Sequence, residues 1–230
     1  GTDNVAIGEN ALDAVTSGAD NTAVGDNALG ANTTANANTA VGSGALLVNT
    51  TGATNVAIGL NALAANTTAN SNTAVGGYAL DANTTGATNT AVGEESLSAN
   101  TTGSNNVAMG YKALLTNATG ASNTAFGTEA LEKNTTDSNT AFGYQAAEET
   151  TTGDFNVAVG ASAFEDNTTG AQNTAIGGYA LRNNTTANNN VAVGYIAMDA
   201  NTTGTNNVAM GAYALDANTT TSSNTAIGYQ

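Results

Sequence analysis

The stretch Asn55-Val56-Ala57-Ile58-Gly59 opens a 17-residue repeat that recurs along the whole chain. The pattern Asn-[Thr/Val]-Ala-[Val/Ile/Met/Phe]-Gly occurs fourteen times, always at a 17-residue interval except for a single 16-residue interval. The repeats begin at Asn4, Asn21, Asn38, Asn55, Asn72, Asn89, Asn106, Asn123, Asn139, Asn156, Asn173, Asn190, Asn207 and Asn224. Residues 1–230 therefore form a single repeat array, which we interpret as a segment of a longer fibre.

The motif predicts a short β-strand, because Val56 and Ile58 would share one face while Ala57 takes the other. Gly59 permits a sharp bend after the strand. The Ala-Leu segment that follows is expected to form a second short strand or a corner, and Asn-Thr-Thr-Gly a turn-rich loop. One 17-residue repeat is then one coil, so the sequence predicts an all-β fold, a β-solenoid (β-roll) of about 13.5 coils.

A second period leaves one alternative open. Valine follows the motif asparagine at every third repeat, at positions 5, 56, 107, 157 and 208, whereas threonine occupies most other repeats. This pattern is also compatible with a triangular 51-residue coil in which each side is one repeat. We favour one coil per repeat, because Val and Thr are nearly isosteric.

The composition excludes several classes of function. The chain has no His, no Cys and no Pro, and its formal net charge is -15 with only three basic residues. It therefore lacks an imidazole base, a thiolate nucleophile and a Cys/His metal site, so we expect no enzyme activity, no metal site and no cofactor. Nucleic-acid binding is disfavoured by the lack of cations, and no segment is apolar enough to span a membrane. The absence of Pro fits strands that are all central in a ladder.

Two sets of apolar residues are candidates for the core and for a chain–chain interface. The large residues of the motif and the leucines are assigned to the core: Val5, Ile7, Leu12, Val24, Leu29, Val41, Leu46, Ile58, Leu63, Val75, Leu80, Val92, Leu97, Phe126 and Phe142. The small motif alanines are assigned to the interface: Ala6, Ala23, Ala40, Ala57, Ala74 and Ala91. This core is thin for the number of residues that each repeat must order, so we expect a homo-oligomer.

The motif Asn4-Val5-Ala6-Ile7-Gly8 closely resembles the Val-Ala-Ile-Gly repeats of trimeric autotransporter adhesin heads. The fuller repeat from Asn139 to Ala146 resembles the Asn-Thr-Ala-Ile-Gly-Tyr arrays of phage tail-fibre-like and bacterial surface proteins. The resemblance covers essentially the whole chain, and it implies a trimer of β-rolls in an extracellular fibre or adhesive head. It also implies that Val5 and Ile7 fill the roll and that Ala6 faces the trimer interface. The longer repeat and its Asn-Thr-Thr-Gly loop depart from that family.

The loop segment contains Asn-x-Thr sequons in register, which are candidate glycosylation sites in an exposed loop. They lie at Asn32, Asn49, Asn66, Asn83, Asn100, Asn117, Asn134, Asn167, Asn184, Asn201 and Asn218. Turn formation explains the same residues without a sugar, and the motif asparagines are expected to form hydrogen-bonded ladders or turn caps.

Other surface residues provide weaker functional signals. Glu94-Glu95, Glu148-Glu149 and Glu165-Asp166 are the only adjacent acidic pairs, and they are interpreted as solvated surface charge, with weak Ca²⁺ binding as the alternative. Seven tyrosines follow the motif glycines and are interpreted as corner packing, with a glycan- or receptor-binding stripe as the alternative. The adjacent threonines suggest an ice-binding array, although neighbouring residues of a strand point to opposite sides.

These observations together predict a structural extracellular fibre segment, on a cell surface or a virion, that serves as a spacer or an attachment surface. The expected partner is the chain itself, as a trimer or an end-to-end filament, together with a cell-surface receptor or a glycan. A self-assembling filament scaffold, which glycans could coat, is the alternative function. An ice- or calcium-binding solenoid is the third.

Overall fold

The computed structural model describes all residues from Gly1 to Gln230, and it contains fourteen short β-strands and no helix. The strands are β1 (Val5–Ile7), β2 (Thr22–Val24), β3 (Thr39–Val41), β4 (Val56–Ile58), β5 (Thr73–Val75), β6 (Thr90–Val92), β7 (Val107–Met109), β8 (Thr124–Phe126), β9 (Thr140–Phe142), β10 (Val157–Val159), β11 (Thr174–Ile176), β12 (Val191–Val193), β13 (Val208–Met210) and β14 (Thr225–Ile227). Each strand is formed by the three residues that follow a motif asparagine.

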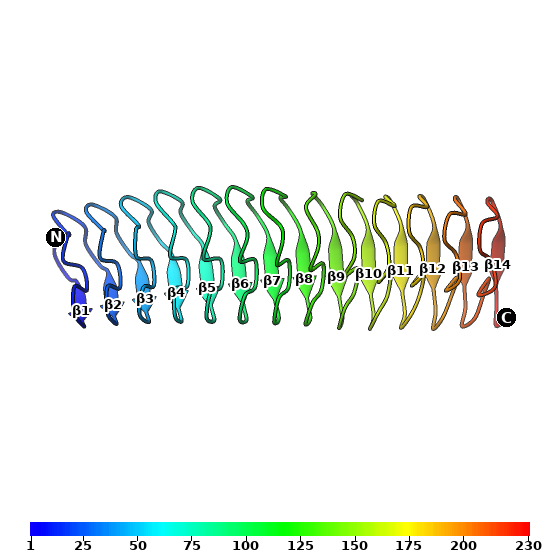
Figure 1. Ribbon diagram of the computed structural model, residues 1–230, viewed down its shortest axis with the longest axis horizontal. Coiled ribbons are helices and arrows are strands. Elements are labelled where there is room, and N and C mark those ends of the chain that lie inside the picture. The colour runs from blue at the N-terminus through cyan, green and yellow to red at the C-terminus, as the bar shows by residue number, and fades with distance from the viewer. The chain divides into compact units, whose positions relative to one another are not determined.

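The chain divides into two compact units, Gly1–Ala121 with β1–β7 and Ser122–Gln230 with β8–β14. In both units each strand pairs in parallel with the next strand along the chain, and Figure 1 shows them side by side in sequence order. Thr22 pairs with Thr39, and Thr39 pairs with Val56, so consecutive coils are offset by one repeat. The predicted all-β solenoid with one 17-residue repeat per coil is therefore confirmed, and the alternative 51-residue coil is wrong.

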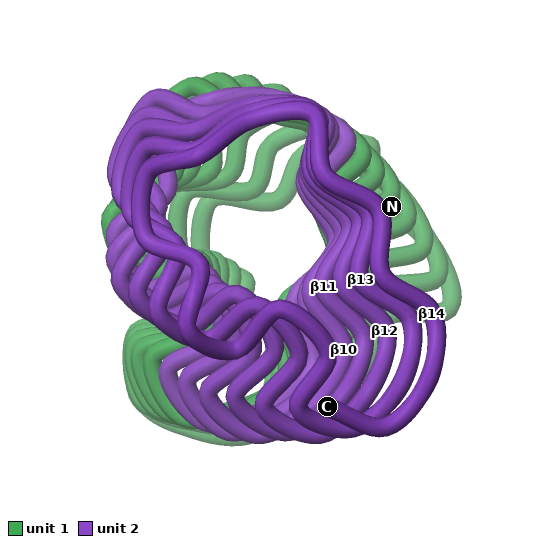
Figure 2. The backbone as a smooth tube through the Cα atoms, turned by 90° about the vertical axis from the view of Figure 1, so that its right-hand side faces the viewer, with its two compact units in different colours: residues 1–121 green, residues 122–230 purple.

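The interior of most coils is filled by small residues, one large apolar residue and two asparagines, and in the coil from Asn139 the last two positions hold Ala147 and Thr150. The motif alanines from Ala23 to Ala209 are fully buried, as is the Ala-Leu pair of most coils, for example Ala79 and Leu80. Figure 2 shows the coils of unit 2 stacked as loops of chain around one axis. Because these side chains are buried within a single chain, they must lie inside the loops. The predicted burial of the leucines Leu12, Leu29, Leu46, Leu63, Leu80 and Leu97 is confirmed.

The motif asparagines form a buried ladder along each unit. The Oδ1 atom of Asn38 accepts the backbone N–H of Asn55 at 2.9 Å, and the Nδ2 atom of Asn38 donates to the carbonyl oxygen of Gly52 at 2.9 Å. The same pair of bonds recurs at Asn72, with Asn89 and Gly86 as partners. Each amide therefore satisfies backbone groups of its own coil and of the next, as buried polar groups require.

The predicted orientation of the strand faces is wrong. The motif alanines Ala23, Ala40, Ala57, Ala74 and Ala91 are completely buried inside the chain and cannot face a neighbour, while Ala6 lies in the first coil and is exposed. The large motif residues point outward: Val5, Ile7, Ile58, Phe126 and Phe142 are exposed, and Val24, Val41, Val75 and Val92 are half-buried. The reason is volume, because one leucine and two asparagines per coil leave room only for alanine on the inner strand face.

Turns rather than a second strand connect each strand to the loop. The backbone N–H of Ala79 donates to the carbonyl of Gly76 at 3.4 Å, and Tyr78 between them has a φ of 56°. This is the pattern of a type II turn, in which the third residue adopts the left-handed conformation. The leucine column is also left-handed, as at Leu80 with a φ of 53°. The residue before the motif asparagine is left-handed too, as at Ser71 with a φ of 60°, so non-glycine residues carry backbone strain at three positions of most coils.

The motif glycine has a different role, which Gly76 illustrates. Its φ of 138° disfavours any side chain, and a Cβ atom there would lie 2.5 Å from the carbonyl oxygen of Gly93 in the next coil. By contrast, nothing lies within 4 Å of a Cβ atom built on the adjacent Gly77. Glycine is therefore required where the bends of consecutive coils touch.

These neighbouring glycines provide a matched test of coil stacking. We expect Gly76→Ala to destabilise the fold by about 3 kcal/mol or more, because strain and a backbone clash coincide. Gly77→Ala should change stability by less than about 0.5 kcal/mol. Urea denaturation followed by circular dichroism measures both effects, and equal midpoints for the two variants would contradict this account of the bend.

Candidate functional site

The side chains that can carry chemistry lie in columns on the outer surface, because equivalent positions of consecutive coils stack directly on one another. The surface has no pocket. Any interaction of the folded chain therefore uses an open face, and the residues that act together are those that share or adjoin a column.

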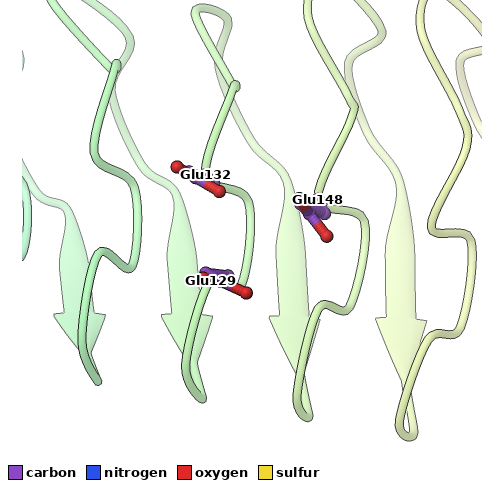
Figure 3. A group of neighbouring side chains, drawn as sticks. All are labelled: Glu129, Glu132 and Glu148. Atoms are coloured by element: carbon purple, nitrogen blue, oxygen red, sulfur yellow. The ribbon is translucent and has the colours of Figure 1, made fainter.

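One column brings three carboxylates together in unit 2. Glu132 and Glu148 occupy equivalent corner positions of adjacent coils, and Glu129 lies one turn before Glu132 in the same coil (Figure 3). One carboxylate oxygen of each residue lies within 4.8 Å of those of the other two, and all three side chains are half-buried. This acidic cluster, Glu129, Glu132 and Glu148, is the densest group of titratable residues in the structure.

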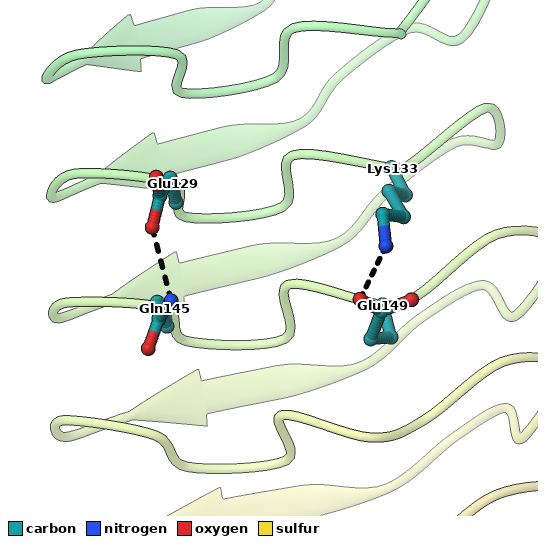
Figure 4. Close-up of polar contacts among 4 residues, drawn as sticks. All are labelled: Glu129, Lys133, Gln145 and Glu149. Carbon is teal, nitrogen blue, oxygen red and sulfur yellow. Dashed lines mark hydrogen bonds and ion pairs between the residues drawn. The ribbon is translucent and has the colours of Figure 1, made fainter.

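Polar neighbours on both sides restrain the acidic cluster. The Nε2 atom of Gln145 donates to the Oε2 atom of Glu129 at 3.0 Å, and the ammonium group of Lys133 donates to Glu149 (Figure 4). Both contacts join adjacent coils. The Glu149 partner raises the pKa of Lys133 above its usual value, so this lysine stays charged beside the cluster.

The electrostatics of the cluster are concentrated on Glu148. Partial burial, together with the charges of Glu132, Glu149, Glu129 and Glu165, raises the pKa of Glu148 from 4.5 to about 7. Burial disfavours the ionised carboxylate, and the neighbouring charges add repulsion. Glu148 therefore changes its charge near neutral pH.

Chemically, the acidic cluster offers three oxygen ligands of the kind that hard cations such as Ca²⁺ prefer. Acidic groups also cluster in proteins without an ion, and the three close carboxylates repel one another. The pair Glu148-Glu149 was recognised from the sequence, whereas Glu129 and Glu132 were missed. The sequence does contain the information needed to find Glu132, because the 16-residue interval places Glu132 and Glu148 in the same column.

The predicted glycosylation sites lie inside the coils rather than in an exposed loop. Ten of the eleven sequon asparagines are completely buried, namely Asn32, Asn49, Asn66, Asn83, Asn100, Asn117, Asn134, Asn167, Asn184 and Asn201, and Asn218 is half-buried. The Nδ2 atom of Asn66 donates to the Oδ1 atom of Asn49 at 2.8 Å and to the carbonyl of Ala69 at 3.1 Å. A glycan has no room there in this fold, so the sequons form a second asparagine ladder.

The adjacent threonines divide into two columns. The hydroxyl of Thr50 donates to the carbonyl oxygen of Thr67 in the next coil at 3.1 Å, whereas Thr51 and Thr68 are exposed. In most pairs the first threonine thus bonds the backbone and the second faces solvent, whereas at Thr135 and Thr136 both hydroxyls bond backbone carbonyls. The structure does not bring the two hydroxyls of a pair together on one face.

The tyrosines are distributed unevenly. Tyr78, Tyr111 and Tyr144 have no aromatic neighbour among the ring contacts of the structure. In unit 2, Tyr179, Tyr195, Tyr213 and Tyr229 come from four consecutive coils and form a continuous row of ring contacts. Tyr78, Tyr111 and Tyr144 are exposed, so the predicted corner packing does not describe them, whereas the second group packs ring against ring.

Comparisons of the chain with known protein families, with curated proteins and with solved structures found no match. The structure has no helix with the length and apolar character needed to cross a membrane.

The titration of Glu148 predicts how stability depends on pH. Between pH 4.5 and about 7 the folded chain holds the Glu148 proton while the unfolded chain has released it. The folded state therefore binds more protons in this window, and its stability falls as the pH rises from 4.5 to 7. We expect a loss on the order of 1 kcal/mol once the solvent screening of this partly exposed group is allowed for.

Urea denaturation at a series of pH values measures this slope. The Glu148→Gln variant should lose the part of the pH dependence that Glu148 causes, and its urea midpoint at pH 8 should be higher than that of the wild type. Asp154→Asn in the same coil removes a charge of the same sign and serves as the control. A wild-type midpoint that rises from pH 5 to pH 8, or an unchanged slope in Glu148→Gln, would contradict the assignment.

Proposed function

We propose that the chain is a structural segment of an extracellular fibre, which serves as a spacer or an attachment surface on a cell or a virion. Three features support this proposal. The coils are near-identical and filled by their own side chains, the surface has no pocket, and the motif resembles the repeats of adhesin heads and tail-fibre-like proteins. The activity of such a segment lies in its surface and in its association with other copies.

The observation that carries this proposal is the outward strand face. We define the strand face as the first and third residues of each three-residue strand, which point outward. The first residue is Thr or Val, and the third is Val, Ile, Met or Phe. Ile58 is 40% exposed, Phe126 is 47% exposed and Phe142 is 42% exposed, and Phe126 stacks on Phe142 with ring centroids 5.5 Å apart. Seven strands at a spacing of about 4.8 Å make an apolar stripe roughly 30 Å long on each unit.

A continuous apolar stripe of this kind marks an interaction surface. Other copies of the chain are suited to cover it, because they present the same residues with the same coil spacing. Small interior residues leave each coil with little apolar burial of its own, so association through the strand face adds stability that one chain lacks. We therefore place the homo-oligomer interface, a trimer by resemblance, on the strand face instead of the alanine face.

Charged substitutions on the strand face test this proposal. Sedimentation equilibrium at micromolar concentration should show a trimer for the wild type, and the double variant Ile58→Glu, Phe142→Glu should shift the population to monomer. The reason is that association would bury an unpaired carboxylate in every copy. The double variant Thr51→Glu, Thr68→Glu, which adds the same charge at two exposed loop positions, should remain a trimer.

Circular dichroism checks that each variant keeps its sheet signal. A wild type that sediments as a folded monomer would overturn the proposal, as would a double variant that remains trimeric.

A further inference from the structure

The four tyrosines of the row, Tyr179, Tyr195, Tyr213 and Tyr229, lie in unit 2 just after the glycine bend and therefore off the strand face. Consecutive ring centroids are 6.1, 5.7 and 5.8 Å apart, and the ring planes meet at 77°, 83° and 71°. Tyr195 is 49% exposed and Tyr229 is 72% exposed. This tyrosine row is thus an accessible ridge of edge-to-face aromatic rings that follows the stacking direction.

The register of the tyrosines gives the row a repeat of two coils. Tyr179 and Tyr213 stand two residues after a motif glycine, whereas Tyr195 and Tyr229 directly follow one, so equivalent positions recur at every second coil. Two coils correspond to about 9.6 Å along the stack. The ring of Tyr195 rests against the preceding coil, since a Cβ atom built on Gly178 would lie in ordinary van der Waals contact with its Cδ2 atom, at 3.5 Å.

The charges beside the row are mostly negative. Arg182 lies over the ring of Tyr179, with its Cζ atom 5.0 Å from the centroid, and its Nε atom is 3.1 Å from Asp199. Asp166 and Asp216 share the electrostatic surroundings of Asp199. Unit 2 as a whole contains ten carboxylates against Lys133 and Arg182, a net charge of -8. A ligand that lies along the row therefore meets a negative potential that favours cations.

We propose that the tyrosine row of unit 2 binds a proline-rich, basic peptide segment in the polyproline II conformation, laid along the stack of coils. Polyproline II has three residues per turn and a rise of about 3.1 Å per residue, so one turn spans roughly 9.3 Å. This matches the repeat of about 9.6 Å between equivalent rings. A proline from each turn contacts every second ring, and the basic residues between prolines pair with the aspartates beside the row.

Two further physical features support this ligand. Proline-rich segments bind aromatic surfaces with little loss of conformational entropy, because the polyproline II helix is already formed in the free peptide. Basic side chains add attraction to Asp166 and Asp216 and can stack on the rings as Arg182 does on Tyr179. A neutral polysaccharide would also stack on tyrosine rings, but it would make no use of the aspartates.

A synthetic peptide of repeated Arg-Pro-Pro triplets is the direct probe. The chain contains no Trp and the peptide contains no aromatic residue, so tyrosine fluorescence of the whole chain reports binding, and calorimetry gives the Kd. We expect saturable binding that weakens but persists as salt is added. Tyr195→Ala and Tyr229→Ala, which remove the two exposed rings of one set, should each raise the Kd about tenfold, whereas Tyr195→Phe, which keeps the ring, should change it by no more than about twofold.

Tyr111→Ala is the matched control, because it removes an exposed tyrosine that has no aromatic neighbour, and it should leave the Kd unchanged. Circular dichroism confirms that each variant is folded. Equal binding of a peptide of Arg-Gly-Ser triplets would show that charge alone attracts the probe and would overturn the proposal. Absence of saturation with the Arg-Pro-Pro peptide would overturn it too, and saturation with a soluble β-glucan in its place would identify the row as a glycan surface.

Discussion

The fold depends on the amide of the motif asparagine, which bonds two coils at once. The Oδ1 atom of Asn72 accepts the backbone N–H of Asn89 in the next coil, while its Nδ2 atom donates to the carbonyl of Gly86 within the same turn of the solenoid. These partners lie 17 and 14 residues away, so the amide fixes both the length of the coil and the place where the loop closes. No other side chain of this size offers an amide donor and a carbonyl acceptor together, which explains why the motif begins with asparagine in every repeat.

The second asparagine ladder and the glycine contact fix the remaining geometry. The sequon asparagines bond the carbonyl three residues on, as Asn83 does with Gly86, and thereby close the loop from inside. The motif glycines let consecutive bends approach closely, and the left-handed leucines direct their side chains inward. Because the asparagine and leucine side chains fill the interior, the larger strand residues are left on the surface. The apolar strand face is therefore a consequence of how the coil packs.

Much of the fold could be predicted from the sequence, because the repeat length determines the size of the coil and the residue types indicate its strand and its turns. The interval between motif asparagines gave the coil, and the alternation in Val56-Ala57-Ile58 gave a strand. The direction of that strand could not be derived in this way, because alternation separates two faces without showing which is inside. That depends on interior volume, which Leu63, Asn55 and Asn66 already occupy. The sequence also suggests an exposed loop position for Asn66, whereas its amide forms hydrogen bonds to Asn49 and Ala69 inside the coil.

The surface groups were predictable only in part. Glu148-Glu149 was visible as an adjacent pair, but Glu132 joins it only through the register of the coils. The tyrosine row requires the same step, since Tyr179 and Tyr195 are distant in sequence and adjacent in space. Once the coil length is known, writing the sequence with one repeat per line recovers such columns. The perpendicular ring geometry and the partial burial of Glu148 still require coordinates.

The single 16-residue interval shows which part of a coil tolerates a change in length. In that coil Asn139 bonds Asn134 and the hydroxyl of Thr136, and the strand pairing between β8 and β9 keeps its register. One residue is thus lost from the loop without a change in the ladder. The addition or removal of a whole coil would disturb even less, because each coil bonds only its neighbours and every coil offers them the same partners. The stacking geometry therefore sets no fixed number of coils, so the length of such an array is independent of the surface chemistry of its coils.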